Sequence, residues 1–187
     1  GEVDHDMVAH RPESDLSNLL ADIMVWAARD YNEKVDFGVY NMGGIRAALV
    51  QGPVTYGDVV DMAPFENKIC FVTLSGTKVL QLFREIASTG GEGVSSSVRL
   101  VITHDGKLKS AQVNGQNIAP AKTYRIATLD YVAQGNDKME AFKSATDVVS
   151  PTSNENNIRF IIIDYFREAA AQGRSVDGPN DERIKVE

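Results

Sequence analysis

Two turn signals in the middle of the chain constrain the fold most strongly. Asp-Gly at 105–106 follows the extended run 97–103, and Asn-Gly at 114–115 follows the extended run 107–113. Such dipeptides between extended runs are the strongest short-range signals for β-hairpins, because their residues tolerate the left-handed backbone of a tight turn. The middle of the chain is therefore predicted to form an antiparallel patch of sheet.

Helical and strand-like patterns alternate through the rest of the 187 residues. A short helix capped by Thr55 is expected to end at Pro64, and residues 183–186 are predicted to form an edge strand. Apolar periodicity predicts longer helices near 16–27, 79–86 and 154–172, and strands at 35–40, 68–75 and 123–129. The whole pattern predicts an α+β fold with a mixed or antiparallel sheet and flanking helices.

No repeat or low-complexity linker divides the chain, so a single compact domain is expected over residues 13–187. Residues 1–12 are polar and show no periodicity, and we expect them to form a flexible lead-in. A net charge of −7 argues against a nucleic-acid partner, which calls for a basic face. No stretch has the roughly 18 apolar residues of a membrane span.

The histidines and the cysteine indicate no metal site. His5 lies between Asp4 and Asp6 in the polar lead-in, without further ligands nearby in the sequence, and His104 lies in a hairpin turn. Cys70 is the only cysteine, which excludes an internal disulfide or a cysteine metal cluster. No nucleophile–base pattern stands out, so no catalytic residue and no cofactor are assigned to this chain.

Three loops carry the residues that suit a nucleotide. In the first loop, Gly43 and Gly44 follow the strand at 35–40. Paired glycines are typical of an ordinary turn, but they also let the backbone approach an anion. Arg46, just beyond them, offers a planar fork of donors that can grip a phosphate.

The other two loops, 64–67 and 131–137, each supply an aromatic ring. Phe65 and Tyr131 can sandwich a flat base, and base–aromatic stacking is worth about 1–3 kcal/mol. Asp137 can accept hydrogen bonds from ribose hydroxyls. The amides of Asn41 and Asn67 can address base edges or bridge the loops.

In these features the chain resembles the C-terminal, substrate-binding domain of the 5'-nucleotidase and UDP-sugar hydrolase family, from about Glu13 to about Phe142. The landmarks in order are Glu13-Ser14-Asp15-Leu16-Ser17-Asn18-Leu19, residues 41–46, Thr55-Tyr56-Gly57-Asp58-Val59, residues 64–67, residues 122–128 and residues 131–137. The resemblance implies a base clamped by the two rings, a ribose held by Asp137 and a phosphate held by Arg46. It also implies a further arginine before the first helix, for which Arg11 is the candidate.

The chain departs from the family pattern at several positions. Met42 stands where a third glycine is usual, and Tyr131 adds a hydroxyl to the commoner phenylalanine. Asn136 and Lys138 replace glycines, which puts the shape of that loop in question. Asn18 stands where some members have an arginine, which removes one phosphate contact.

The resemblance also implies a partner. Enzymes of this family carry an N-terminal metallophosphoesterase domain whose two divalent metal ions activate the attacking water. This chain lacks that half, so it is predicted to bind nucleotides for a hydrolase of nucleotide catabolism while being inactive alone. The catalytic half is expected either in the same polypeptide or as a separate chain, and the short polar lead-in slightly favours a separate chain. The implied location is periplasmic or extracellular.

Two other hypotheses stay open. The chain is alternatively a free-standing nucleoside- or nucleotide-binding protein without a hydrolase partner. A structural domain that has lost its ligand would have lost its pocket residues, whereas all of them remain, so this hypothesis ranks last. Because stacking tolerates every base, the preferred base and the phosphate form are left open.

Overall fold

The computed structural model describes residues 1–187. Short 3₁₀ helices lie at Ala28–Tyr31, Met42–Gly44, Glu140–Ser144 and Asn154–Asn156. The strands and helices follow in the order β1 (Glu2–Val3), α1 (Asp15–Ala27), β2 (Phe37–Tyr40), β3 (Gly52–Pro53), α2 (Tyr56–Met62), β4 (Ile69–Ser75), α3 (Gly76–Ser88), β5 (Gly93–Val94), β6 (Val98–Ile102), β7 (Leu108–Val113), β8 (Gln116–Asn117), β9 (Thr123–Leu129), α4 (Asp130–Ala133), β10 (Thr146–Val149), α5 (Ile158–Ala171) and β11 (Ile184–Val186).

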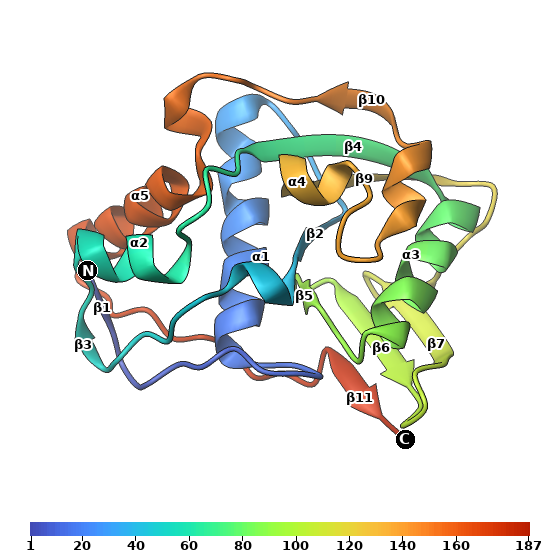
Figure 1. Cartoon of the computed structure of the whole chain (residues 1–187), viewed down its shortest axis with the longest axis horizontal. Helices are drawn as coiled ribbons and strands as arrows, with labels where there is room; N and C mark the ends of the chain where they lie inside the picture. Colours follow the sequence, from blue (N-terminus) through green and yellow to red (C-terminus); the bar gives the residue numbers. More distant parts are fainter.

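A five-stranded mixed sheet lies at the centre, with strand order β10-β4-β9-β2-β5 (Figure 1). Strands β4 and β9 pair antiparallel along their full length, from Ile69 opposite Leu129 to Ser75 opposite Thr123. Strand β2 runs parallel to β9, and β5 and β10 pair antiparallel at the two edges. The predicted mixed sheet with flanking helices is confirmed.

A second sheet has the order β11-β6-β7-β8. The Asp-Gly turn joins β6 to β7, with Gly106 at a positive φ of 82°, and the Asn-Gly turn joins β7 to β8. Both predicted hairpins are therefore present. Strand β11 pairs parallel to β6, with Ile184 opposite Leu100, so the predicted C-terminal edge strand is also present.

Helices α1 and α3 cover opposite faces of the central sheet. Successive residues of a strand point to opposite faces. On β2, Phe37 packs against Phe83 of α3, with ring centroids 5.3 Å apart. Its neighbour Gly38 faces α1, where a Cβ atom would lie 2.9 Å from the carbonyl oxygen of Ala21. A glycine at 38 therefore lets α1 pack closely on the sheet.

The N-terminal residues correct one prediction. Residues 1–12 do not form a loose lead-in but pack against the domain, since Val3 and Met7 are fully buried. Strand β1 pairs with β3, and Met7 exchanges backbone hydrogen bonds with Leu49. Two buried apolar residues four positions apart in a polar segment are too few to produce a periodic signal in the sequence.

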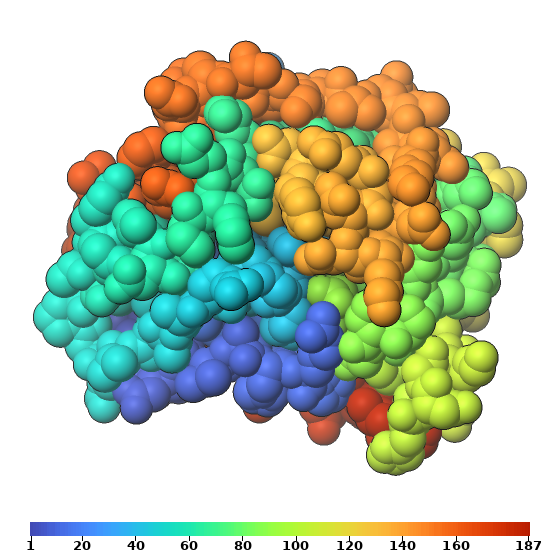
Figure 2. Space-filling model, in the orientation of Figure 1, coloured from blue at the N-terminus to red at the C-terminus, as the bar shows by residue number.

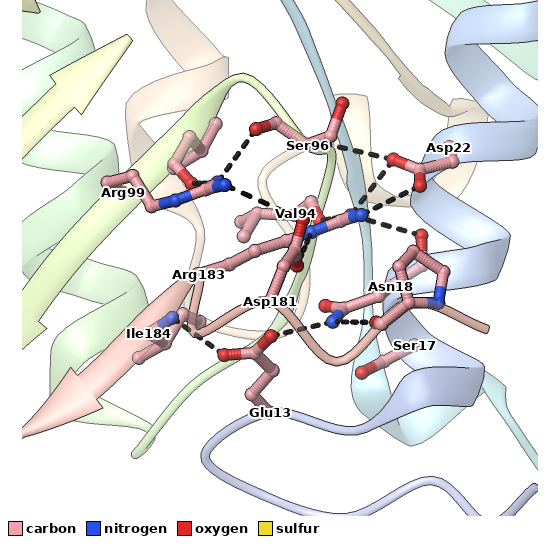
Figure 3. Close-up of polar contacts among 12 residues, drawn as sticks. Glu13, Ser17, Asn18, Asp22, Val94, Ser96, Arg99, Asp181, Arg183 and Ile184 are labelled. Carbon is pink, nitrogen blue, oxygen red and sulfur yellow. Dashed lines mark hydrogen bonds and ion pairs between the residues drawn. The ribbon is translucent and has the colours of Figure 1, made fainter. Parts of the chain in front are cut away.

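A buried arginine fastens the C-terminal segment (Figure 3). Arg183 is completely buried and donates to both carboxylate oxygens of Asp22 on α1, at 2.9 and 2.8 Å. It also donates to the carbonyl oxygens of Asn18 and Val94, at 3.3 and 2.8 Å, and to Asp181 at 2.7 Å. This cluster joins the start of β11 to α1 and β5.

The buried side chains of Glu13 and Asn18 extend the cluster. Glu13 accepts hydrogen bonds from the backbone N–H of Ile184 and from the Asn18 amide, which also donates to the carbonyl of Pro179. Asn18 is thus part of the same C-terminal fastening. No helix of the structure has the length and apolar character that crossing a membrane requires.

Candidate functional site

Strand directions bring the three predicted loops to one edge of the central sheet. Because β2 and β9 run parallel, the loops that follow Tyr40 and Leu129 leave at the same edge. Strand β4 runs antiparallel to β9, so the loop that precedes Ile69 arrives there too. The segments 41–46, 64–67 and 131–137 therefore meet, although long stretches of chain separate them.

A cavity of about 400 Å³ opens between these loops. Figure 2 shows the three segments meeting around a hollow on the face turned toward the viewer. The lining residues are Asn41, Gly43, Gly44, Arg46, Phe65, Asn67, Tyr131 and Asp137. The structure thus brings together eight of the nine site residues that were predicted from the sequence.

The two aromatic rings are open to solvent. Phe65 is 46% exposed and Tyr131 is 40% exposed, whereas most large apolar side chains of this chain lie in its core. Both line the same cavity from different loops. Exposed rings that share a cavity are typical of a site for a flat ligand.

A polar network ties the first loop to the third. The side-chain amide of Asn41 donates to Asp137 Oδ2 at 2.6 Å, and the Tyr131 hydroxyl lies 3.5 Å from Asp137 Oδ1. Asn136 donates to the backbone carbonyl of Tyr131 at 2.8 Å. The Asp137 carboxylate is therefore oriented from both sides while still lining the cavity.

The paired glycines have different neighbours. A Cβ atom on Gly44 would lie 2.9 Å from Asn41 Oδ1, so the absence of a side chain makes room for the Asn41 amide. A Cβ atom on Gly43 would lie 3.5 Å from Asp137 Oδ2, which is an ordinary contact. Gly44 therefore supports the polar network, while Gly43 leaves backbone open to the cavity.

Arg46 has an unpaired guanidinium at the rim. It forms no ion pair and no side-chain hydrogen bond, and its central carbon lies 5.9 Å from the centroid of the Phe65 ring. Its five N–H donors are therefore available to an anion that reaches the cavity.

Arg11 is not part of this cavity, which corrects the expectation from the sequence. Its Nη2 donates to Glu92 at 2.8 Å and its Nε donates to the carbonyl of Gly91 at 2.9 Å. It lines a separate surface depression beside Gly90 and His104. Arg11 therefore forms an ion pair with the buried carboxylate of Glu92, which lies far away in the sequence.

The third loop has an unusual backbone. Asp137 and Lys138 both have positive φ angles, of 55° and 64°. Such angles favour glycine, because a Cβ atom crowds the following carbonyl oxygen. The loop therefore keeps a conformation suited to glycine although Lys138 occupies the position.

Two residues outside the cavity support it and were missed by sequence reasoning. Glu92 accepts a hydrogen bond from the backbone N–H of Met42, next to the paired glycines, at 2.7 Å. Arg159, at the start of α5, donates to the backbone carbonyls of Pro64 and Phe65 at 2.9 and 3.2 Å. No local pattern could reveal contacts between segments so far apart in the sequence.

The structure has no group of three or more His, Cys, Asp or Glu side chains arranged to hold a metal ion. His5, which the sequence places between two aspartates, shares a hydrogen bond at 2.7 Å with Asp15 in the first turn of α1. This hydrogen bond, together with that to Asp4, raises the pKa of His5. The contact thus joins the N-terminal segment to α1.

Comparison with known proteins places the chain in one family. Residues 1–144 match the family described as 5'-nucleotidase, C-terminal domain. Protein UshA of Salmonella pullorum is 34% identical over 158 residues, which are 82% of this chain and 27% of UshA. The chain therefore spans about a quarter of the length of this relative. The match begins at residue 1, earlier than the landmarks in the sequence indicate.

Solved structures agree with this match. The 5'-nucleotidase precursor from Thermus thermophilus superposes with a TM-score of 0.85 at 25% identity, over 100% of this chain and 39% of that chain. The NAD nucleotidase of Haemophilus influenzae superposes with a TM-score of 0.74 at 21% identity, over 100% of this chain and 36% of that chain. At this lower identity, the second structure shows a common fold only.

Proposed function

This chain belongs to the family of 5'-nucleotidase C-terminal domains, and we propose that it is the nucleotide-recognition part of a 5'-nucleotidase-type phosphohydrolase. The observation that carries the proposal is the cavity between three loops. It holds two solvent-exposed rings, an unpaired arginine and a pre-oriented carboxylate. This set of groups suits a nucleotide: the rings suit a base, the arginine suits a phosphate and the carboxylate suits a ribose.

Each part of the ligand has its own partner in this proposal. Phe65 and Tyr131 stack on the two faces of the base, and Asn41 and Asn67 contribute polar edges. The Asp137 carboxylate accepts hydrogen bonds from the ribose hydroxyls. Arg46 binds the phosphate, and the exposed backbone at Gly43 lets the ligand approach closely.

The chemical step belongs to another domain in this proposal. A metallophosphoesterase domain, in the same polypeptide or in a separate chain, holds two divalent metal ions that activate water and stabilise the developing charge. The binding energy from the present domain positions the phosphate at those ions, which lowers the barrier although none of its side chains reacts. We also propose that the protein works outside the cytoplasm, in the periplasm or the extracellular space.

Calorimetric titration with adenosine and AMP tests the pocket. Phe65→Ala and Tyr131→Ala should each weaken binding of both ligands by about 1–3 kcal/mol, because one stacking face is lost. Tyr56→Ala is the matched control, since Tyr56 is also an exposed aromatic residue, at 57%, but does not line the cavity. A loss of similar size in the control would contradict the assignment of the two rings.

Arg46→Ala tests the phosphate contact in the same titrations. AMP should lose much more affinity than adenosine, because only AMP carries the phosphate that the guanidinium binds. Equal losses for the two ligands would rule out this role for Arg46.

Reconstitution distinguishes the recognition domain from a free-standing nucleotide-binding protein. The chain is mixed with the metallophosphoesterase domain from the same source and with Mn²⁺, and release of phosphate from AMP is measured. Hydrolysis by the mixture, but by neither part alone, supports the proposed division of labour. Binding of AMP without hydrolysis by the mixture favours the free-standing protein, and hydrolysis by this chain alone contradicts both.

A further inference from the structure

A buried carboxylate lies directly behind the loop that carries Asn41, the paired glycines and Arg46. The side chain of Glu92 is about 1% exposed and does not line the cavity between the three loops. It accepts three hydrogen bonds from three separate segments: from Met42 N–H at 2.7 Å, from Arg11 Nη2 at 2.8 Å and from Thr89 Oγ1 at 2.6 Å. Glu92 therefore joins the N-terminal segment, the end of α3 and the pocket loop at one point.

Because it is buried, the Glu92 carboxylate needs an opposite charge and hydrogen-bond donors nearby. A charged group removed from water is tolerated only when it is paired and its lone pairs accept hydrogen bonds. Arg11 supplies the charge, and its guanidinium also donates to the carbonyl of Gly91. Both carboxylate oxygens of Glu92 accept hydrogen bonds. These bonds fix the position of the side chain, because hydrogen bonds weaken steeply when their distances or angles change.

The contact with Met42 determines the shape of the pocket loop. Residues 42–44 form a single 3₁₀ turn, and Asn41 immediately precedes it. The N–H groups at the start of a helical turn have no partner within the turn. Met42 is buried, so water cannot replace Glu92 as the acceptor for its N–H. Without Glu92, the start of the turn would lose this anchor, while the hydrogen bond from Arg46 N–H to the carbonyl of Met62 would still hold its far end.

We propose that Glu92 is a positioning residue for nucleotide binding, with Arg11 as its counter-ion. This inference rests on the proposed function, since it assumes that the loop binds the ligand. Glu92 holds the turn so that Asn41 reaches Asp137 and Arg46 reaches the phosphate. Arg11 neutralises the buried charge of Glu92, while the contact of Glu92 with Met42 N–H fixes the loop.

Two substitutions of Glu92 distinguish the effect of its hydrogen bond to Met42 N–H from the effect of its negative charge. Glu92→Gln keeps the length of the side chain and an oxygen that can accept from Met42 N–H. Its amide loses the ion pair with Arg11, which is 44% exposed and can turn to solvent. Glu92→Asp keeps the charge but is one CH₂ shorter, so it cannot reach Met42 and Arg11 together. AMP affinity should fall about tenfold in Glu92→Asp and change by less than about threefold in Glu92→Gln.

Glu85→Asp is the matched control. Glu85 is also a glutamate near the end of α3 that accepts a backbone N–H across the fold, from Ala141 at 2.8 Å. It does not contact the pocket loop, so its shortening should lower stability without changing AMP affinity. Equal effects of Glu92→Asp and Glu85→Asp on AMP affinity would overturn the proposal.

A double-mutant cycle excludes a merely structural effect. If Glu92 acts by placing Arg46, then Glu92→Asp should reduce AMP affinity much less in an Arg46→Ala background than in the wild type. An equal reduction in both backgrounds would show that Glu92 does not act through Arg46.

Hydrogen exchange without ligand keeps this inference separate from the proposed function. In Glu92→Asp, the amides of residues 41–46 should exchange faster, while those of β4 and β9 stay protected. Faster exchange in a protein that binds neither AMP nor adenosine would reject the proposed function but keep the anchoring role. Unchanged exchange at 41–46 in Glu92→Asp would overturn the anchoring role whatever the ligand.

Discussion

Replacing Arg183 by methionine tests how strongly the C-terminal segment is fastened. Methionine fills much of the volume of the arginine stem but donates no hydrogen bond. The change removes the guanidinium donors from two backbone carbonyls and from Asp22, which keeps only the N–H of Ser96 at 3.0 Å. Removing one partner of a buried ion pair typically destabilises a protein by about 3–5 kcal/mol. Asp22 is 29% exposed and can partly rehydrate, so we expect a loss at the lower end, about 3 kcal/mol.

Urea denaturation at pH 7, followed by the fluorescence of the single tryptophan, measures this loss. Arg99→Met is the matched control, because Arg99 pairs with the same Asp181 but at 3.5 Å and with 42% of its side chain exposed. The control should lose less than about 1 kcal/mol. A loss below about 1 kcal/mol for Arg183→Met, or equal losses in the two variants, would refute the argument from burial.

Two further predictions concern pH and packing. The guanidinium of Arg125 lowers the pKa of Glu33 below its ordinary value of 4.5, so the stability that Glu33 adds is complete above that pH. Glu33→Gln should therefore lower the free energy of unfolding more at pH 7 than at pH 3, where protonation of Glu33 begins to remove its contribution. Gly44→Ala should lower the free energy of unfolding by about 1–3 kcal/mol, because its Cβ would displace the Asn41 amide. Gly43→Ala should change it by less than about 0.5 kcal/mol in the same denaturation assay.

Local signals in the sequence predicted local structure well. The Asp-Gly and Asn-Gly turns require backbone conformations that few other residues adopt, and both hairpins form where these signals stand. The helical spacing from Leu16 to Ala27 likewise matches α1, which begins after the cap at Ser14. Such elements depend on neighbours within a few positions, so composition and spacing are sufficient to find them.

Contacts between residues far apart in the sequence could not be predicted from the sequence alone. Arg11 has the right chemistry for a phosphate, but its partner Glu92 lies 81 residues away and is buried. In the same way, nothing local distinguishes Arg183, which is buried, from Lys185, which is half exposed two positions later. The pocket residues were found because their chemical types suit a ligand, whereas their convergence depends on the directions of three paired strands.

The parallel pairing of β2 with β9 has a consequence for how the cavity forms. Phe37 meets Ile126 and Gly38 meets Ala127, so the two sides of the cavity join only after the long intervening stretch of chain has folded. Partly folded or truncated chains that lack this pairing therefore have no complete cavity. A small molecule that binds there selects the finished molecule and shifts the folding equilibrium toward it as its concentration rises. Ligand-dependent thermal shifts can thus serve as a quality test for preparations of this domain.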